Sequence, residues 1–195
     1  MRAAFGFRSH SGFATLVVAT GSLAKGQVLE RRRIELVAAG VPRQPYHEAQ
    51  PLPFAAAEAL VGRARAEALR AAQVAVAAAL EDARNRGLLV QRAGLLVGSG
   101  KRLPPLDKIL ASHALIHAAE GELYREVLRG ACEAAGLRVA PVPEKEVRAR
   151  GAELLGGKDA LERRLVALGR ELGAPWREDE KHAALAAWMA AGSGR

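Results

Sequence analysis

The segment of residues 54–86 constrains the fold more than any other part of the chain. It is rich in alanine and other strong helix formers and contains no proline. At 1.5 Å per residue it predicts one helix of roughly 50 Å, which Gly87 ends and which Gly62 is able to interrupt. A helix of this length needs a surface to pack on, so the segments on either side decide the fold class.

Strand-forming residues dominate the part of the chain before this helix. Residues 5–19 read as strand, with turn residues from Ser9 to Gly12, and residues 21–26 predict a hairpin turn. Residues 28–37 predict a further strand pairing. Residues 42–53 are rich in proline and predict an irregular loop. The amino-terminal part is therefore expected to be a β-meander.

The part after the long helix alternates between helix and strand. Residues 88–97 predict a buried strand, residues 106–135 a second long helix that ends at Gly136, and residues 137–142 a short strand. Two helices are expected at residues 159–172 and 178–191. This order implies an α/β fold with a mixed sheet, and the length of 195 residues fits one domain spanning 1–195.

Composition excludes several classes of protein. Cys132 is the only cysteine, which excludes an internal disulfide framework and fits a reducing compartment. No segment approaches the roughly 20 apolar residues that span a bilayer, and the amino terminus lacks a signal-peptide pattern. We expect a cytoplasmic protein with no membrane partner.

The formal net charge of +8 favours a nucleic-acid partner, since phosphate backbones attract lysine and arginine. Most of the arginines are scattered through an alanine-rich chain. Arg31, Arg32 and Arg33 form the one compact cluster. Charge alone therefore supports structured DNA or RNA as a partner without establishing it, and a homo-oligomer stays open.

Several segments resemble the RuvC-type Holliday-junction resolvases of the ribonuclease H-like superfamily. They are residues 5–7 and 15–18 (a strand, a glycine-containing turn and a return), 94–97, 131–139, 143–147, and the acidic, alanine-rich residues 179–188. The resemblance covers most of the chain in pattern more than in identity. It implies a ribonuclease H-like mixed sheet with flanking helices.

The same resemblance implies a phosphodiesterase site with metal ions held by four acidic groups. The first-strand position falls at residues 8–10 and the fourth-strand position at Gly98 and Ser99, where no carboxylate occurs. On the last helix the candidates are Asp179, Glu180 and His182. Two of the acids are missing, so the sequence argues against a conventional two-magnesium site.

The motif SHALIHAAE, residues 112–120, places His113, His117 and Glu120 on one helix face. Apolar residues continue the same stripe, so we expect this face to lie on the sheet. Burying two imidazoles and a carboxylate is costly unless they are paired or bind something. Three interpretations stay open: mutual satisfaction at the core edge, a transition-metal site with a third ligand from Glu120, His10 or His182, or a polar cleft without metal.

In a ribonuclease H-like sheet the resemblance brings His10, Ser99 and His182 into one cleft, with Ser112 and His113 nearby. Imidazole suits a transition metal better than magnesium, and histidine can act as acid or base near neutral pH. Residues 46–48 (Tyr-His-Glu) lie in the proline-rich loop, where capping of the next helix is the simpler interpretation. The turn at residues 98–102 (GSGKR) lacks P-loop spacing, yet its glycines and its basic Lys101 and Arg102 suit a nucleic-acid phosphate.

Two functions follow from these observations. The first is a RuvC-like domain with a degenerate carboxylate site that binds structured nucleic acid or a protein partner through Arg31, Arg32, Arg33, Lys101 and Arg102. The alternative is a transition-metal-dependent phosphodiesterase, with His10, Ser99, His113 and His182 as catalytic candidates and His113, His117 and Glu120 as metal ligands. Missing carboxylates favour the first, and whether the protein is an enzyme stays open.

Overall fold

The computed structural model describes residues 1–98, 100 and 102–192. Five strands form one sheet in the order β3-β2-β1-β4-β5. Their bounds are Arg2–His10 (β1), Phe13–Thr20 (β2), Gln27–Glu35 (β3), Leu89–Val97 (β4) and Arg138–Pro143 (β5). β1, β2 and β3 are antiparallel neighbours, whereas β4 runs parallel to β1 and β5 parallel to β4. The predicted mixed sheet is confirmed.

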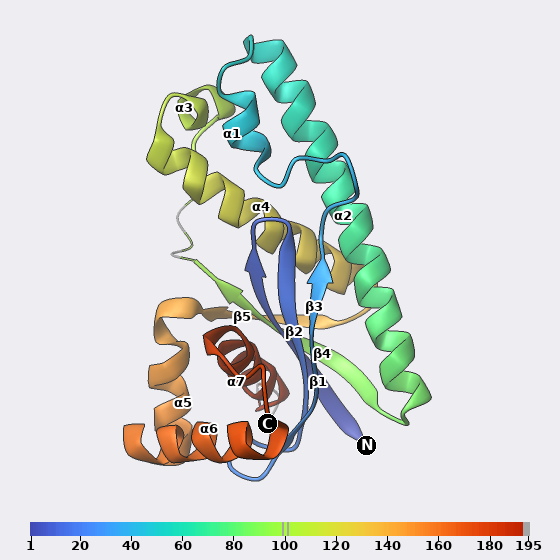
Figure 1. Ribbon diagram of the computed structural model, residues 1–195, viewed down its shortest axis with the longest axis vertical. Coiled ribbons are helices and arrows are strands. Elements are labelled where there is room, and N and C mark those ends of the chain that lie inside the picture. Colours follow the sequence, from blue (N-terminus) through green and yellow to red (C-terminus); the bar gives the residue numbers. More distant parts are fainter. Residues whose placement is uncertain (99, 101, 193–195) are drawn as a thin grey trace.

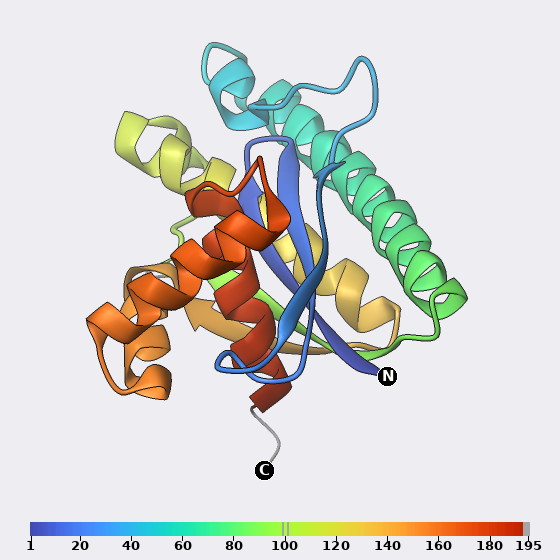
Figure 2. The same ribbon diagram turned by 60° about the horizontal axis from the view of Figure 1, so that its bottom comes forward.

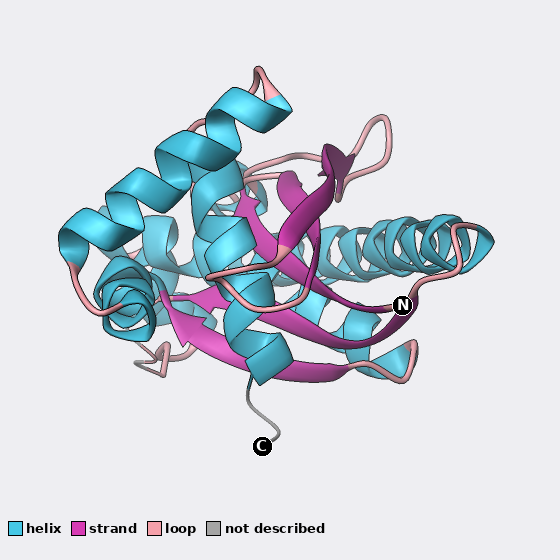
Figure 3. Ribbon diagram, turned by 90° about the horizontal axis from the view of Figure 1, so that it is seen from below, coloured by secondary structure: helices cyan, strands magenta, loops and turns pink. Residues whose placement is uncertain are grey.

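Helices cover both faces of the sheet (Figure 1). Their bounds are Pro45–Ala49 (α1), Phe54–Asn85 (α2), Leu106–Leu110 (α3), His113–Ala134 (α4), Val147–Leu155 (α5), Lys158–Leu172 (α6) and Glu178–Gly192 (α7), with a 3-10 turn η1 at Glu144–Glu146. Figure 2 shows α7 crossing one face of the sheet with α2 and α4 behind it, and Figure 3, seen from below, shows helices in front of the strands and behind them.

Successive side chains of the central strands point to opposite faces of the sheet, so each face has its own hydrophobic core. Phe5, Phe7 and Leu95 pack with α2 and α4, while Val17 and Leu96 pack with α5, α6 and α7. These side chains are buried, which is expected of central strands covered on both sides. Within the described residues, no helix combines the length and the hydropathy needed to cross a membrane.

The helix predicted over residues 54–86 is confirmed as a single element, and Gly62 does not interrupt it. Buried alanines from Ala57 to Ala83 line its inner face. Gly87 has a φ of +69°, and the amides of Gly87 and Leu88 donate to the carbonyls of Arg84 and Ala83. This is a Schellman arrangement, which closes the helix as the sequence predicts.

Two predictions of regular structure are wrong. The proline-rich residues 42–53 were expected to be irregular, yet they contain α1, because Pro45 occupies the first turn of that helix, where a missing N–H costs nothing. Residues 106–135 were expected to form one helix, but Ser112 adopts an extended conformation (φ −137°, ψ 114°) and separates α3 from α4. The segment with η1 and α5 was not predicted as helix.

Candidate functional site

Charged residues meet at the carboxyl end of β1, in a group that we call the Arg8 corner: Arg8, His10, Glu144, Asp179 and His182. Nε of Arg8 donates to Oε1 of Glu144 at 2.9 Å, and Nη1 lies 2.5 Å from Oδ1 of Asp179. His10 contributes Nε2 at 3.0 Å from the other oxygen of Asp179. One guanidinium therefore joins the end of β1 to η1 and to the first turn of α7.

His182 completes the corner from the next turn of α7. Its Nε2 lies 3.3 Å from Oε2 of Glu178. Burial lowers the pKa of His182, and the positive charge of Arg8 lowers it further, against the opposite pull of Glu178 and Glu144. His182 is therefore held toward its neutral form. His10 and His182 lie at one corner, as expected, and Ser99 lies outside the described residues.

A second cluster consists of three imidazoles, His47 from α1 and His113 and His117 from α4, which we call the histidine triad. One ring nitrogen from each lies within 4.8 Å of the others. Nε2 of His113 and Nε2 of His117 are 2.9 Å apart. His113 and His117 are exposed, so the prediction that both face the sheet is wrong. The buried face of these turns of α4 is formed by Ile116, Ala119 and Glu120, and the two histidines lie beside it.

Glu120 is buried beneath the histidine triad, with 2 % of its surface exposed. Its Oε1 accepts hydrogen bonds from the backbone amides of Tyr46 (2.8 Å) and His47 (3.1 Å) and lies 3.2 Å from Nδ1 of His47. Burial raises the pKa of Glu120, while the hydrogen bonds from His47 and Tyr46 act against that rise. Glu120 thus contacts Nδ1 of His47. In the histidine triad, it is His47 that supplies the third imidazole beside His113 and His117.

The arginines predicted to bind nucleic acid have partners within the protein. Nη2 of Arg31 donates to the backbone carbonyl of Leu172 at 2.8 Å. Arg32 pairs with Glu30 and Asp82, and Arg33 pairs with Glu35 and lies over the ring of Phe13. Arg102 is exposed, and Lys101 lies outside the described residues. The role of these residues as nucleic-acid contacts stays a prediction.

Other basic side chains gather where the parallel strands end. A groove at the carboxyl ends of β4 and β5 is lined by Gly98, Gly100, Lys145 and Arg150, among others. Arg125 of α4 lies next to Gly98, since a Cβ on that glycine would be 3.1 Å from Nη1 of Arg125. This groove and the Arg8 corner occupy the same edge of the sheet, because Glu144 and Lys145 are both in η1.

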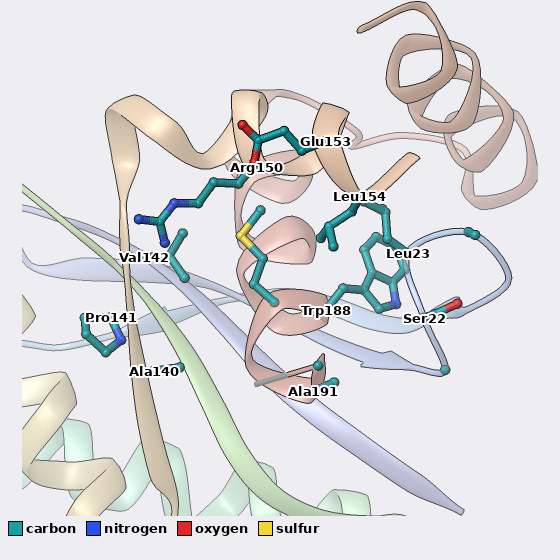
Figure 4. Close-up of a pocket in the computed structure, with 14 residues that line it drawn as sticks. Ser22, Leu23, Ala140, Pro141, Val142, Arg150, Glu153, Leu154, Trp188 and Ala191 are labelled. Carbon is teal, nitrogen blue, oxygen red and sulfur yellow. The ribbon is translucent and has the colours of Figure 1, made fainter. Parts of the chain in front are cut away.

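The pocket drawn in Figure 4, with a volume of about 820 Å³, shares Pro141 and Arg150 with this groove. Leu23, Val142, Leu154, Trp188 and other residues of α5, α7, β5 and the β2–β3 turn line it. None of its described lining residues belongs to the Arg8 corner or to the histidine triad. Its lining combines apolar side chains with Arg150 and Glu153, and we assign it no role.

No family model matches the chain, and no curated protein matches it. Among solved structures, Thermus thermophilus RuvC in complex with a Holliday junction substrate is similar, with a TM-score of 0.53 and 14% identity over 96% of this chain and 91% of that one. A second Thermus thermophilus RuvC structure gives a TM-score of 0.49 and 14% identity over 95% and 90%. The fold is RuvC-like and ribonuclease H-like. This likeness establishes the fold alone.

Three residues with central contacts were given no role by the sequence. Arg8 lies among residues 8–10, where the resemblance places a carboxylate that this sequence lacks, and Glu144 lies in the segment 143–147, which carries the resemblance but no predicted role. The sequence did offer a signal for His47, which lies two residues after Pro45 in the proline-rich segment 42–53. Capping of the next helix was the simpler interpretation there, and only the fold brings His47 next to α4.

Proposed function

We propose that this protein is a RuvC-like nucleic-acid-binding protein with a degenerate carboxylate site, and that it binds structured DNA without metal-dependent cleavage. The binding surface is the edge of the sheet at which β1, β4 and β5 end. The observation that carries the proposal is the position of Arg8 between Glu144 and Asp179.

Arg8 lies in the stretch where the family resemblance would place a first-strand carboxylate. Its guanidinium is charged at every relevant pH, so it repels a divalent cation at this corner. It also engages Glu144 and Asp179, two carboxylates that could otherwise serve as ligands. The residues present therefore do not fit a two-magnesium site, and we derive no hydrolytic step through one.

Nucleic-acid binding is supported by the basic residues at the same edge. Lys145 and Arg150 line the groove, Arg125 lies next to Gly98, and Arg102 is exposed after β4. Arg125 and Arg150 also pair with Glu122 and Glu146. In open α/β sheets, ligands commonly bind outside the carboxyl ends of the strands. The net charge of +8 adds a long-range attraction for phosphate. The similar Thermus thermophilus RuvC is described in complex with a Holliday junction, so a four-way junction is the first ligand to test.

The first experiment measures fluorescence anisotropy of a labelled four-way junction, a matched duplex and a single strand at several salt concentrations. With four basic side chains on phosphates, log K against log salt should fall with a slope of about −3 or steeper. The junction should bind at least about 10-fold tighter than the duplex, because only a branched ligand lets several phosphate backbones reach the edge at once. A binding constant that does not depend on salt concentration, or the absence of binding, contradicts the proposal.

Variants locate the surface. Lys145→Ala and Arg102→Ala should each weaken junction binding and lower the salt slope by about 1. Arg84→Ala is the matched control, since Arg84 is exposed in the last turn of α2, away from this edge, and its loss should leave the slope unchanged. A junction incubated with the protein and Mg²⁺ or Mn²⁺ should stay intact. Cleavage that Asp179→Asn abolishes would show that the carboxylates still hold metal.

A further inference from the structure

We propose that His47, His113 and His117 form a transition-metal site, of the kind that binds Zn²⁺, which fastens α1 to the first turns of α4. Nothing in the nucleic-acid proposal requires this site, and its ligands are distinct from the Arg8 corner. The expectation from the sequence was a site with His113, His117 and Glu120 as ligands. The geometry points to His47 as the third ligand, with Glu120 behind it.

The three ring nitrogens already lie at nearly the separation that a metal ion requires. Tetrahedral zinc with bonds of 2.0–2.1 Å to histidine places its ligand nitrogens about 3.3 Å apart. In this protein the nitrogens lie within 4.8 Å of one another, and those of His113 and His117 are 2.9 Å apart. Because His113 and His117 are exposed, small rotations of their side chains close the remaining difference.

Two elements far apart in the sequence supply the ligands. His113 and His117 are four residues apart on α4, so their side chains project from one face one turn apart. His47 comes from α1, whose start is fixed by Pro45. All three rings are close in edge-on pairs, with centroids 4.4 to 5.6 Å apart. A pair of helical histidines is common on protein surfaces, whereas a third imidazole brought from another element is not expected by chance.

Glu120 provides the independent observation that points to a metal ion. A ligating histidine usually donates its other ring N–H to a carboxylate, which fixes the tautomer and makes the free nitrogen a better ligand. Nδ1 of His47 lies 3.2 Å from Oε1 of Glu120. With Nδ1 protonated, Nε2 of His47 carries a lone pair and is available to a metal. The two backbone amides of α1 that bind the same oxygen hold this carboxylate in place.

A metal ion also accounts for the burial of Glu120. A buried carboxylate is costly unless its charge is compensated, and Oε2 of Glu120 has no hydrogen-bond partner among the described residues. A divalent cation held by His47 would place two positive charges one imidazole away from it. Without metal, the hydrogen-bond contacts of this carboxylate among the described residues are those of Oε1 with the amides of Tyr46 and His47 and with Nδ1 of His47.

The donor set selects the class of metal. Three neutral imidazoles suit Zn²⁺, Co²⁺, Ni²⁺ or Cu²⁺, whereas Mg²⁺ and Ca²⁺ require oxygen ligands. Among the described residues, these three imidazoles form the group, and no further histidine, cysteine or acidic ligand joins them. The fourth position therefore belongs to water, on the exposed side of His113 and His117. Because the ligands span α1 and α4, metal binding stabilises the folded chain.

The test uses the full chain, stripped with a chelator, and Co²⁺ as a spectroscopic probe. One equivalent of Co²⁺ should produce the intense visible absorption of four-coordinate cobalt, and one equivalent of Zn²⁺ should abolish it. His47→Ala, His113→Ala and His117→Ala should each weaken Zn²⁺ binding at least 10-fold in competition with a chromophoric chelator. Circular dichroism verifies that each variant is folded.

The chain contains its own matched controls. Of its five histidines, His10 and His182 belong to the Arg8 corner. His10→Ala and His182→Ala should bind Co²⁺ and Zn²⁺ as the unaltered protein does. Glu120→Gln keeps the side-chain shape and removes the charge, and it should weaken Zn²⁺ binding by 10- to 100-fold without losing the four-coordinate spectrum.

Three outcomes overturn the proposal. The first is the absence of stoichiometric Co²⁺ or Zn²⁺ binding to the unaltered chain. The second is unchanged affinity in His47→Ala, which would mean that His113 and His117 act alone as a surface pair. The third is loss of binding in the His10 or His182 control. Junction binding measured in excess chelator reports on the nucleic-acid proposal separately, so the two can fail independently.

Discussion

At the carboxyl end of β1, one guanidinium holds together carboxylates from two other elements. Arg8 is 21% exposed at its side chain and contacts both Glu144 and Asp179. Arg8→Ala leaves these two acids near each other without their cation. We expect the free energy of unfolding to fall by about 1–2 kcal/mol, after allowance for partial exposure.

Urea denaturation of Arg8→Ala measures this change. The matched control is Arg70→Ala, which removes an exposed pair with Glu67 on α2 and should change stability by less than about 0.5 kcal/mol. Equal effects for the two variants would mean that Arg8 forms only an ordinary surface ion pair.

A pH dependence follows from His182 at the same corner. Its pKa is lowered in the folded protein by burial and by Arg8, so the unfolded chain binds a proton more readily. The resulting stability is fully present above the ordinary histidine pKa of about 6.5 and is lost as the pH falls through the lower, folded value. Urea midpoints measured from pH 7.5 down to 5 should fall less steeply in His182→Gln. Parallel curves for the two proteins would contradict this assignment.

Contacts of individual residues could be predicted from the sequence only where the two residues are close together in the chain. Contacts within one helix, such as those between His113 and His117, follow from a spacing of four. Contacts between elements, such as His47 with Glu120 or Arg8 with Asp179, depend on packing that no local pattern encodes. The stripe predicted on α4 is confirmed at Ile116, Glu120 and Tyr124, which are buried, and is wrong at His113 and His117, which are exposed.

Among the elements, α7 depends on two glycines in the strands beneath it. A Cβ on Gly6 would lie 1.8 Å from the carbonyl oxygen of Ala183, and one on Gly94 would lie 2.0 Å from that of Ala186. The alanine-rich helix therefore lies directly on the strand backbones. Gly6→Ala or Gly94→Ala should force α7 off the sheet and lower the free energy of unfolding by more than about 2 kcal/mol.

Gly62→Ala is the control for these substitutions. Nothing lies within 4 Å of a Cβ at Gly62, which is in the interior of α2. Because alanine favours helix, this variant should raise the free energy of unfolding by up to about 1 kcal/mol in the same thermal or urea assay. If Gly6→Ala changed the free energy of unfolding as little as Gly62→Ala does, α7 would not depend on close approach to the strand backbone at Gly6.

Element boundaries were predicted where a local stop signal exists. Gly87 and Gly136 end α2 and α4 as expected, since their positive φ values permit the turn that closes a helix. The break at Ser112 has no comparable signal, because neither proline nor glycine occurs from Leu106 to Glu120. Proline misled the prediction at residues 42–53, since the same residue that disrupts a helix interior is favourable in the first turn.

For the whole molecule, the order of elements carried more information than any motif. A β-meander followed by alternating helices and strands allows few sheets, and the parallel placement of β4 beside β1 follows from a crossover through α2. The RuvC-like fold expected from this order is confirmed by a similar structure at 14% identity. Function is not carried by the order, since it depends on particular side chains that a shared fold does not specify.

The two cores share one sheet, which predicts how the molecule unfolds. Both tryptophans, Trp176 and Trp188, belong to the core with α5, α6 and α7, whereas the long helices α2 and α4 belong to the other. Tryptophan fluorescence therefore reports on one face, and far-ultraviolet circular dichroism is dominated by the other. Because β1, β2 and β4 contribute side chains to both cores, loss of either face exposes the strands beneath the other. Urea transitions followed by the two signals should coincide, as expected of a single domain, and separate midpoints would show that the two faces unfold independently.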